Sequence, residues 1–283
     1  MIRPESLTWI FCSIRSGSTW LSSMMGSVDG HAVWNEPCVG QLFGEFYEKT
    51  LEAHRSSPSF IMGDANREHW LGAIRRFVLD AATHAFPHLS ESGHLAVKEP
   101  GGGSLGAPLL SQALPESRLI LLVRDPRDIM ASILDSAREG GWFYQLQDPD
   151  RRGPNALPDR KPNVYVKRRS DLYMRQMEAA RAAYDDHRGP KTLIKYEDLL
   201  SDPLGVLRQT YSTLRISVEE RELARVVDKQ SWVNIPEGDR GEGKFFRKGA
   251  AKSWHEDLTP RQVTLVEEIA GPVLDEFYPD TVD

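Results

Sequence analysis

Residues 7–20 read LTWIFCSIRSGSTW, an apolar run followed by a short polar stretch and the start of a second apolar pattern. The run Leu7–Cys12 predicts a buried strand, because bulky and β-branched side chains in a short continuous series fit the core of a sheet. Beyond Ser16–Thr19 the apolar residues recur at helical spacing, at Trp20, Leu21, Met24 and Met25. The stretch therefore predicts a strand, a tight loop and a helix.

The same alternation of strand and helix continues along the chain. Apolar runs predict further strands at Leu95–Val97, Arg118–Val123 and Thr192–Tyr196. Helical patterns occur at His69–His84, Asp128–Glu139 and Val164–Asp186. Alternation of this kind predicts an α/β fold of three layers, in which helices flank a central parallel sheet.

Two segments without periodicity, residues 145–162 and 234–252, predict long surface loops, and loops of this length often close over a ligand. The 283 residues include 40% hydrophobic and 27% charged side chains, which is the composition of a globular chain with a substantial core. We therefore expect one domain, residues 1–283, with these two loops as lids.

The charge balance and the cysteines narrow the class of protein. Thirty-five Lys and Arg against 41 Asp and Glu give a net charge of −6, which argues against nucleic acid or an anionic membrane surface as the main partner. No apolar window is long enough for a membrane span and no signal peptide is recognisable, so we expect a cytoplasmic chain. Cys12 and Cys38 lack metal-ligand spacing and are expected to be reduced.

The polar stretch Arg15–Thr19 is a candidate anion site. At the start of a helix, the backbone N–H groups of Ser16, Gly17, Ser18 and Thr19 can converge on a negative group, and Arg15 adds a full positive charge. The nucleotide-kinase pattern GxxxxGK[ST] is absent. Taken alone, the tetrapeptide Ser16–Thr19 fits an N-capped turn equally well.

Four segments, taken together, resemble a known family. Arg15–Trp20 resembles the 5′-phosphosulfate loop of the sulfotransferases that use 3′-phosphoadenosine 5′-phosphosulfate (PAPS). Arg124–Asp128, followed by Ser132, resembles the family's 3′-phosphate motif, and Tyr196–Leu199 is similar to its YEDL-like strand end. Phe246–Gly249, followed by Trp254, is similar to the late segment whose Arg, Lys and Gly close over the 3′-phosphate.

The resemblance implies a P-loop-like fold, PAPS as the donor, 3′-phosphoadenosine 5′-phosphate (PAP) as the product, and no metal. Trp20 matches the Trp that stacks on adenine, and Ser231-Trp232 resembles the pair that covers the other face of the ring. The donor-binding residues implied in this way are Arg15, Ser16, Gly17, Ser18, Thr19, Trp20, Arg124, Ser132, Tyr196, Ser231, Trp232, Arg247, Lys248 and Gly249. Without the resemblance, residues 124–128 could equally form a solvated charge pattern, and Trp232 could be a core aromatic residue.

The chain departs from the family's pattern at three points, and the first of them makes it resemble the bacterial and carbohydrate-type branches more than the cytosolic small-molecule branch. Arg15 stands where the cytosolic branch has Lys, and Ser253 stands where Asp normally precedes the late Trp. The strand-end Lys98, which resembles the Lys that touches the sulfuryl oxygens, is followed by Glu99 and Pro100 rather than by a His two residues later. The resemblance to the cytosolic branch therefore does not identify the general base.

Carboxylates are the main candidates for that base, because an alcohol acceptor must lose its proton during transfer. Glu36, beside Pro37 after the first helix, occupies a setting similar to that of the acidic base in bacterial and carbohydrate-type relatives. Glu99 competes with it, and either residue could simply cap a helix or pair with a cation. His31 and His94 are further candidates, although a lone His is more often structural. We expect Arg15 to neutralise the leaving phosphate, Lys98 to contact the sulfuryl group and Glu36 to act as the base.

The acceptor is not identified by the sequence. The loops expected to shape its pocket, residues 43–69, 101–104 and 145–162, are compatible with small natural products, glycans or lipids. A homo-oligomer also stays open. The alternatives to sulfuryl transfer are a kinase-like phosphotransferase, against which the absent kinase pattern argues, and a nucleotide-binding protein without catalytic activity.

Overall fold

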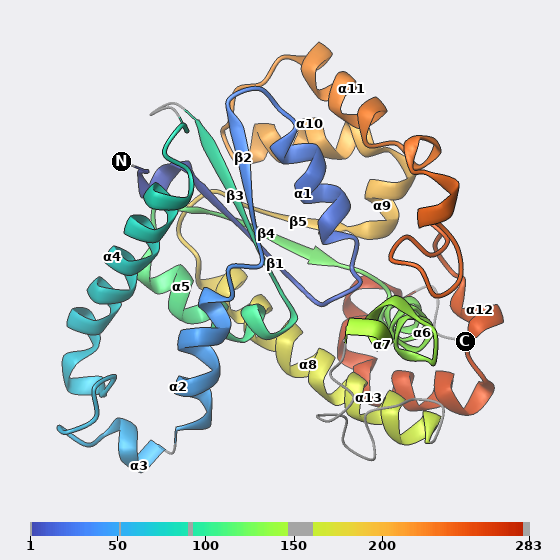
Figure 1. The fold of residues 1–283 in the computed structure, drawn as a ribbon. Coiled ribbons are helices and arrows are strands. Elements are labelled where there is room, and N and C mark those ends of the chain that lie inside the picture. Colours follow the sequence, from blue (N-terminus) through green and yellow to red (C-terminus); the bar gives the residue numbers. More distant parts are fainter. Residues whose placement is uncertain (1, 51, 90–92, 147–160, 280–283) are drawn as a thin grey trace.

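The computed structural model describes residues 2–50, 52–89, 93–146 and 161–279. Within these ranges five strands form one sheet in the order β2 (His31–Asn35), β3 (His94–Pro100), β1 (Leu7–Cys12), β4 (Arg118–Val123) and β5 (Lys191–Lys195). Every neighbouring pair is parallel. The sheet lies at the centre of the molecule (Figure 1). The predicted α/β fold with a central parallel sheet is confirmed.

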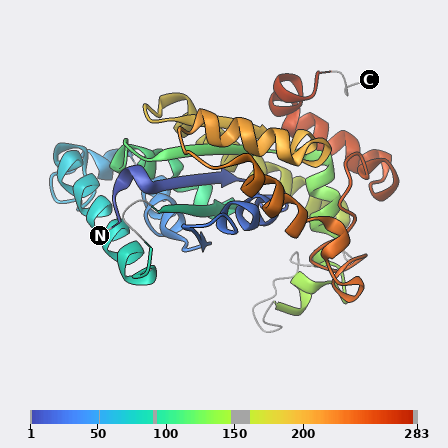
Figure 2. The same ribbon diagram turned by 90° about the horizontal axis from the view of Figure 1, so that it is seen from above.

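Helices cover both faces of this sheet (Figures 1 and 2). Alternate side chains of β1 point to opposite faces, so that Trp9 belongs to one core cluster and Ile10 to the other. The first cluster includes residues of α4 (Arg67–Ala85), α5 (Ala107–Ala113), α6 (Pro126–Ala137), α8 (Pro162–Asp186) and α13 (Pro260–Phe277). The second includes residues of α1 (Ser18–Gly26), α9 (Tyr196–Ser201), α10 (Pro203–Thr213) and α11 (Glu220–Lys229).

Shorter elements connect the main helices and strands. A π-helical turn η2 (Gln41–Glu45) and α2 (Phe46–Lys49) follow β2, and η4 (Gly101–Gly106) follows β3. The remaining short elements are η1 (Pro4–Ser6), α3 (Glu52–Arg55), η3 (Asp64–Asn66), α7 (Trp142–Leu146), η6 (Trp232–Asn234), η7 (Glu237–Asp239) and α12 (Trp254–Asp257). None of the helices in the described ranges combines the length and apolarity needed to cross a bilayer.

Two details of the sequence-based fold were wrong. Tyr196 does not end a strand, because β5 stops at Lys195 and Tyr196 begins α9. The strand β2 was not predicted, since it is a short edge strand whose side chains are only partly buried and show no continuous apolar run. The predicted loop 234–252 is irregular apart from η6 and η7. In the loop predicted at 145–162, residues 147–160 lie outside the described residues, and the lid role of both loops stays a prediction.

The parallel sheet brings three segments to one edge. Cys12 is in register with Pro100 on β3 and with Leu122 on β4, so these three strands end side by side. The loops that follow them lead into α1, η4 and α6. Asn35 is in register with Lys98, which brings Glu36 to the same edge. In open parallel sheets, ligands bind beyond this edge.

Candidate active site

The loop between β1 and α1 has the backbone of an anion site. Arg15 and Gly17 have φ angles of 64° and 89°, whereas the residues around them keep negative φ. Alternation of this kind turns successive N–H groups toward one point, at the positive end of a nine-residue helix. Gly17 is required for two reasons, since its φ is left-handed and a Cβ there would lie 2.4 Å from the Tyr196 ring.

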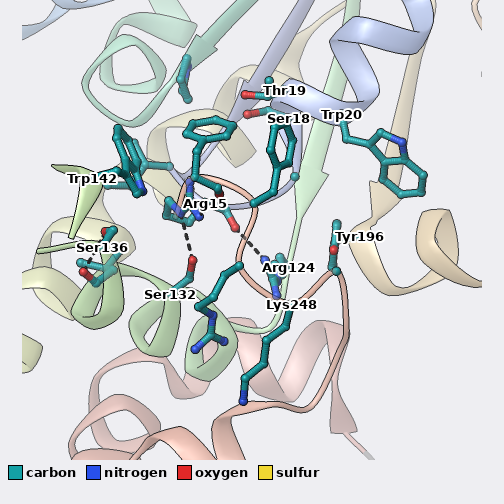
Figure 3. A pocket seen from close by; sticks show the side chains of 18 of the residues that line it. Arg15, Ser18, Thr19, Trp20, Arg124, Ser132, Ser136, Trp142, Tyr196 and Lys248 are labelled. Atoms are coloured by element: carbon teal, nitrogen blue, oxygen red, sulfur yellow. Dashed lines mark hydrogen bonds between the residues drawn. The ribbon is translucent and has the colours of Figure 1, made fainter. Parts of the chain in front are cut away.

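A cavity of about 280 Å³ opens beside this loop (Figure 3). Its walls come from the start of α1, from α6 and α7, from α9 and from residues 230–250. Most of the predicted site residues line it together: Arg15, Gly17, Ser18, Thr19, Trp20, Glu36, Arg124, Ser132, Tyr196, Trp232, Arg247, Lys248 and Gly249. Four do not line it, namely Ser16, Lys98, Glu99 and Ser231.

Two arginines that line the cavity, Arg15 and Arg124, are held by hydrogen bonds. Arg15 donates from Nε to Ser132 Oγ at 2.9 Å, and Arg124 donates from Nη1 to the Arg15 carbonyl at 3.0 Å (Figure 3). Arg124 also lies over the Tyr196 ring, 4.2 Å from its centre. Burial, together with the charges of Arg124 and Arg247, lowers the pKa of Arg15 to about 10. Positive groups packed this closely make the cavity a strong site for an anion.

The late segment of the chain closes one side of the cavity. Arg247 donates to Asp257 Oδ2 at 2.7 Å and to Ser253 Oγ at 2.6 Å, and the Lys248 ammonium lies 2.9 Å from Asp257 Oδ1. Buried Asp128, in the first turn of α6, accepts from the backbone N–H groups of residues 252 and 254 and from the Ser253 hydroxyl. The segment 247–254 is therefore fastened to α6.

Lys98 connects the anion loop to Glu36. Its ammonium donates to Thr19 Oγ1 at 3.0 Å and lies 3.0 Å from Glu36 Oε1. The Lys98 side chain is 5% exposed, whereas that of Glu36 is 56% exposed and borders the cavity. A carboxylate in this position is accessible to a second substrate and is held by one cation.

Glu99 faces away from the cavity. Successive residues of a strand point to opposite faces of the sheet. Because the Lys98 side chain points toward Thr19, the Glu99 side chain points to the opposite face. There the buried carboxylate accepts from the Val39 N–H at 2.8 Å, and burial raises the pKa of Glu99 to about 7. His31 and His94 begin β2 and β3, at the opposite end of the sheet, with their rings 5.0 Å apart. Neither histidine lines the cavity.

Aromatic residues line the part of the cavity next to α1 and η6. Trp20 donates from its indole nitrogen to the Gln230 carbonyl at 2.8 Å, which fixes the ring. Trp232 packs on Gly249, where a Cβ would lie 2.6 Å from the indole. With Tyr196, these rings offer flat apolar surface beside the cations.

Several cavity residues were missed in the sequence. Trp142 and Phe245 enclose the Arg15 guanidinium, which lies 5.4 and 5.1 Å from their ring centres. Phe143 and Arg169 line the same cavity. The aromatic residues lie next to or within the two predicted loops. Their position there was the one feature of the sequence that could have indicated them as cavity residues. Nothing in the sequence pattern distinguished Arg169 from the other cations of α8.

A family model described as "Sulfotransferase family" matches residues 9–220. The chain belongs to the sulfotransferase family. The match begins in β1 and extends to the start of α11, so it includes the anion loop, Lys98, Arg124, Ser132 and Tyr196. The predicted membership of the sulfotransferase family is confirmed, and the fourth of the four segments, residues 246–254, lies beyond the matched residues.

Known sulfotransferases resemble this chain over part of their length. Omega-hydroxy-beta-dihydromenaquinone-9 sulfotransferase Stf3 of Mycobacterium tuberculosis is 27% identical over 180 residues, which are 64% of this chain and 40% of the relative. Carbohydrate sulfotransferase 1 of Danio rerio is 25% identical over 248 residues, which are 84% of this chain and 56% of the relative. The chain thus spans 40% and 56% of the lengths of these two sulfotransferases.

Solved sulfotransferases share the fold over nearly the whole chain. The crystal structure of mouse sulfotransferase SULT7A1 complexed with PAP has a TM-score of 0.59 and 14% identity, and the match covers 98% of this chain and 86% of that one. Sulfotransferase STF9 of Mycobacterium avium gives a TM-score of 0.57 at 14% identity, over 98% of this chain and 78% of that one. The arrangement of sheet and helices is thus that of sulfotransferases.

Ser253, which departs from the family's pattern, still contributes to the loop. Its hydroxyl donates to Asp128 Oδ1 at 3.1 Å and accepts from Arg247. The late loop therefore forms these hydrogen bonds through a hydroxyl at the position where the family's pattern has a carboxylate.

Proposed function

We propose that this sulfotransferase-family chain transfers a sulfuryl group from PAPS to an acceptor hydroxyl and releases PAP. The observation that carries the proposal is a single cavity that joins the amino-terminal end of α1 to Ser132, Arg124 and Arg247, with aromatic rings beside them. PAPS has a phosphosulfate at one end, a 3′-phosphate at the other and a flat base. The cavity offers donors for two anionic groups and rings for the base.

Each group of the donor has candidate partners. The N–H groups at residues 16–19 would bind the 5′-phosphosulfate, and Arg124, Ser132, Arg247, Lys248 and Gly249 would bind the 3′-phosphate. Trp20, Tyr196 and Trp232 would contact adenine. Ser231 lies between Gln230 and Trp232, which line the cavity, but does not line it itself, so we assign it no direct contact with the donor.

The role of Arg15 has two versions. The sequence places it at the leaving phosphate, where charge accumulates as the bond from sulfur to the bridging oxygen breaks. Its guanidinium instead bonds Ser132 Oγ, toward the proposed 3′-phosphate site. We propose that Arg15 contributes to transition-state stabilisation. Whether replacing Arg15 lowers turnover more than it lowers PAP affinity decides between the two versions.

We propose Glu36 as the general base. The acceptor oxygen attacks sulfur while the bond from sulfur to the bridging oxygen breaks, and PAP leaves with that electron pair. The hydroxyl proton passes to the Glu36 carboxylate, which borders the cavity and adjoins Lys98. Lys98 donates to Thr19 and pairs with Glu36, which leaves a third N–H for a sulfuryl oxygen. The scheme uses no metal.

The acceptor wall favours an apolar molecule that carries a hydroxyl group. Ile133, Trp142, Phe143 and Phe245 form this wall, and Arg169 adds one cation to it. A lipid or an aromatic natural product fits such a surface better than a glycan does, because apolar area dominates recognition there. The name of the mycobacterial relative, which denotes a sulfotransferase of a hydroxylated menaquinone, agrees with this choice.

The test has two stages. PAP should raise the melting temperature clearly more than ATP does at equal concentration. The protein is then incubated with PAPS and a panel of phenols, aliphatic alcohols and sugars, and sulfated products are sought by mass spectrometry. Equal stabilisation by ATP and PAP would favour a phosphotransferase. PAP binding without product from any acceptor, and without release of sulfate from PAPS, would identify a binding protein.

A further inference from the structure

The turn that carries Glu36 has an unfavourable backbone. Glu36 and Cys38 have φ angles of 51° and 59°, in the left-handed region that residues with a Cβ rarely adopt. Pro37 lies between them and has no N–H with which to bind the turn to its surroundings. Such a conformation persists only where neighbouring structure holds it.

Consecutive residues of β3, Lys98 and Glu99, accept hydrogen bonds from the two ends of this turn. The Glu36 N–H donates to the Lys98 carbonyl at 2.9 Å. At the other end, the Val39 N–H donates to the Glu99 carboxylate at 2.8 Å, and the Gly40 N–H donates to the same carboxylate. The turn therefore spans from the main chain of Lys98 to the side chain of Glu99.

The surroundings of Glu99 are closely fitted to its carboxylate. A Cβ on Gly103 would lie 2.0 Å from Glu99 Oε2, so only glycine leaves room for it. The Ser104 hydroxyl donates to the Glu99 carbonyl at 2.8 Å and fixes the main chain there. Among the described residues no cation pairs with Glu99, and it does not line the cavity. Within the described ranges, the hydrogen bonds that its side chain accepts come from the end of the turn.

We infer that Glu99 is a positioning residue, which holds the strained turn 36–38 so that the Glu36 carboxylate stays beside Lys98 at the cavity. The inference rests on the proposed role of Glu36 as the base. It gives Lys98 and Glu99 complementary tasks from opposite faces of one strand: Lys98 pairs with the Glu36 side chain, and Glu99 fixes the backbone behind it. The raised pKa of Glu99 agrees with a carboxyl that is enclosed for structural reasons.

The test uses the full chain and release of labelled sulfate from PAPS, in which water replaces the acceptor. Glu99→Ala should lower kcat about a hundredfold and change the KM for PAPS less than about twofold, because a small displacement of a catalytic group affects the reaction more than donor binding. Glu99→Gln keeps an oxygen that accepts from Val39 and should retain most of the activity. Ser111→Ala in α5, which removes a buried hydrogen bond to His187, controls for general loss of stability.

A double-mutant cycle separates this inference from the proposed function. In a Glu36→Gln background, Glu99→Ala should cost less than about a further twofold, because its effect passes through Glu36. Hydrogen exchange at Val39 and Gly40 should accelerate about tenfold or more in Glu99→Ala and much less in Glu99→Gln.

Failure has distinct signatures. If Glu36→Gln retains wild-type activity, the proposed base is wrong, whereas the exchange data still report whether Glu99 holds the turn. Unchanged exchange at Val39 and Gly40 in Glu99→Ala would overturn the inference. So would an equal loss of rate with and without the Glu36 carboxylate.

Discussion

Replacing Glu99 with glutamine is expected to stabilise the protein more at pH 8 than at pH 5. Burial raises the pKa of Glu99 from 4.5 to about 7, and this effect outweighs the opposing N–H groups of Val39 and Gly40; the nearby charge of Glu36 also raises it. Because the folded pKa is raised, the folded protein binds the proton more tightly than the unfolded chain does. The stability contributed by this group is therefore present at low pH and is lost as pH rises from 4.5 to 7.

The magnitude follows from the two pKa values. A difference of about 2.5 corresponds to about 3 kcal/mol lost above pH 7, since each pKa unit is worth about 1.4 kcal/mol. At pH 5 the unfolded carboxyl is already mostly ionised, so about 1 kcal/mol of this loss is present there. Glutamine does not titrate. The free energy of unfolding of the variant, relative to wild type, should thus increase by about 2 kcal/mol between pH 5 and pH 8.

The assay is urea unfolding of both proteins at both pH values, followed by tryptophan fluorescence. A constant cost of the substitution cancels, because only the change between the two pH values is compared. Glu116→Gln is the control: the hydrogen bond from Arg75 lowers the pKa of Glu116, so both pH values lie above its titration and the difference should stay flat. If Glu99→Gln also gives a flat difference, Glu99 is ionised in the folded protein at pH 5, and the argument from burial is refuted.

Three further predictions concern the cavity. Asp128→Ala should lower the free energy of unfolding by about 3 kcal/mol in urea titrations, because two backbone N–H groups and the Ser253 hydroxyl lose their acceptor, whereas Asp171→Ala on the exposed face of α8 should change it little. Arg247→Ala should weaken PAP binding about ten- to a hundredfold by calorimetry and Ser132→Ala should weaken it less, while adenosine 5′-phosphosulfate binds all three proteins alike; unchanged PAP affinity in both variants would remove these residues from the 3′-phosphate site. Arg15→Ala should lower turnover far more than PAP affinity, and a variant that loses only PAP affinity would assign Arg15 to the 3′-phosphate through Ser132.

Strands could be predicted where burial on both faces requires a continuous run of apolar residues. The residues of β1 and β4 are buried on both faces, almost without exception, and their apolar runs mark the strands without ambiguity. The edge strand β2 has one neighbour and partly buried side chains, so its five residues resemble a loop. Tyr196 was assigned to a strand because its aromatic ring extends the apolar pattern of β5, although the chain has already turned into α9 there.

Part of the cavity could be predicted, because some of its residues are neighbours in the sequence. Residues 15–20 carry their geometry locally, since a strand, a left-handed glycine and a helix start are all read from neighbouring residues. The enclosure of Arg15 by Trp142 and Phe245 depends on segments a hundred or more positions away, and no local pattern encodes it. The residues proposed to bind the donor were therefore accessible to sequence reasoning, whereas those of the proposed acceptor wall were not.

The comparison of Glu36 with Glu99 shows why the edge strand β2, which was not predicted, matters for the site. In the sequence both carboxylates are adjacent to a proline. Glu36 was preferred as the base because its setting resembles that of relatives, and Glu99 competed with it as the direct neighbour of Lys98. In the structure β2 pairs with β3 so that Asn35 lies beside Lys98, and the next residue, Glu36, reaches the Lys98 ammonium from the neighbouring strand. Alternation along β3 then directs Glu99 to the opposite face. Glu36, 62 positions away in the chain, thus pairs with Lys98. Glu99, the direct neighbour of Lys98, instead accepts a hydrogen bond from the Val39 N–H, at the end of the turn that carries Glu36.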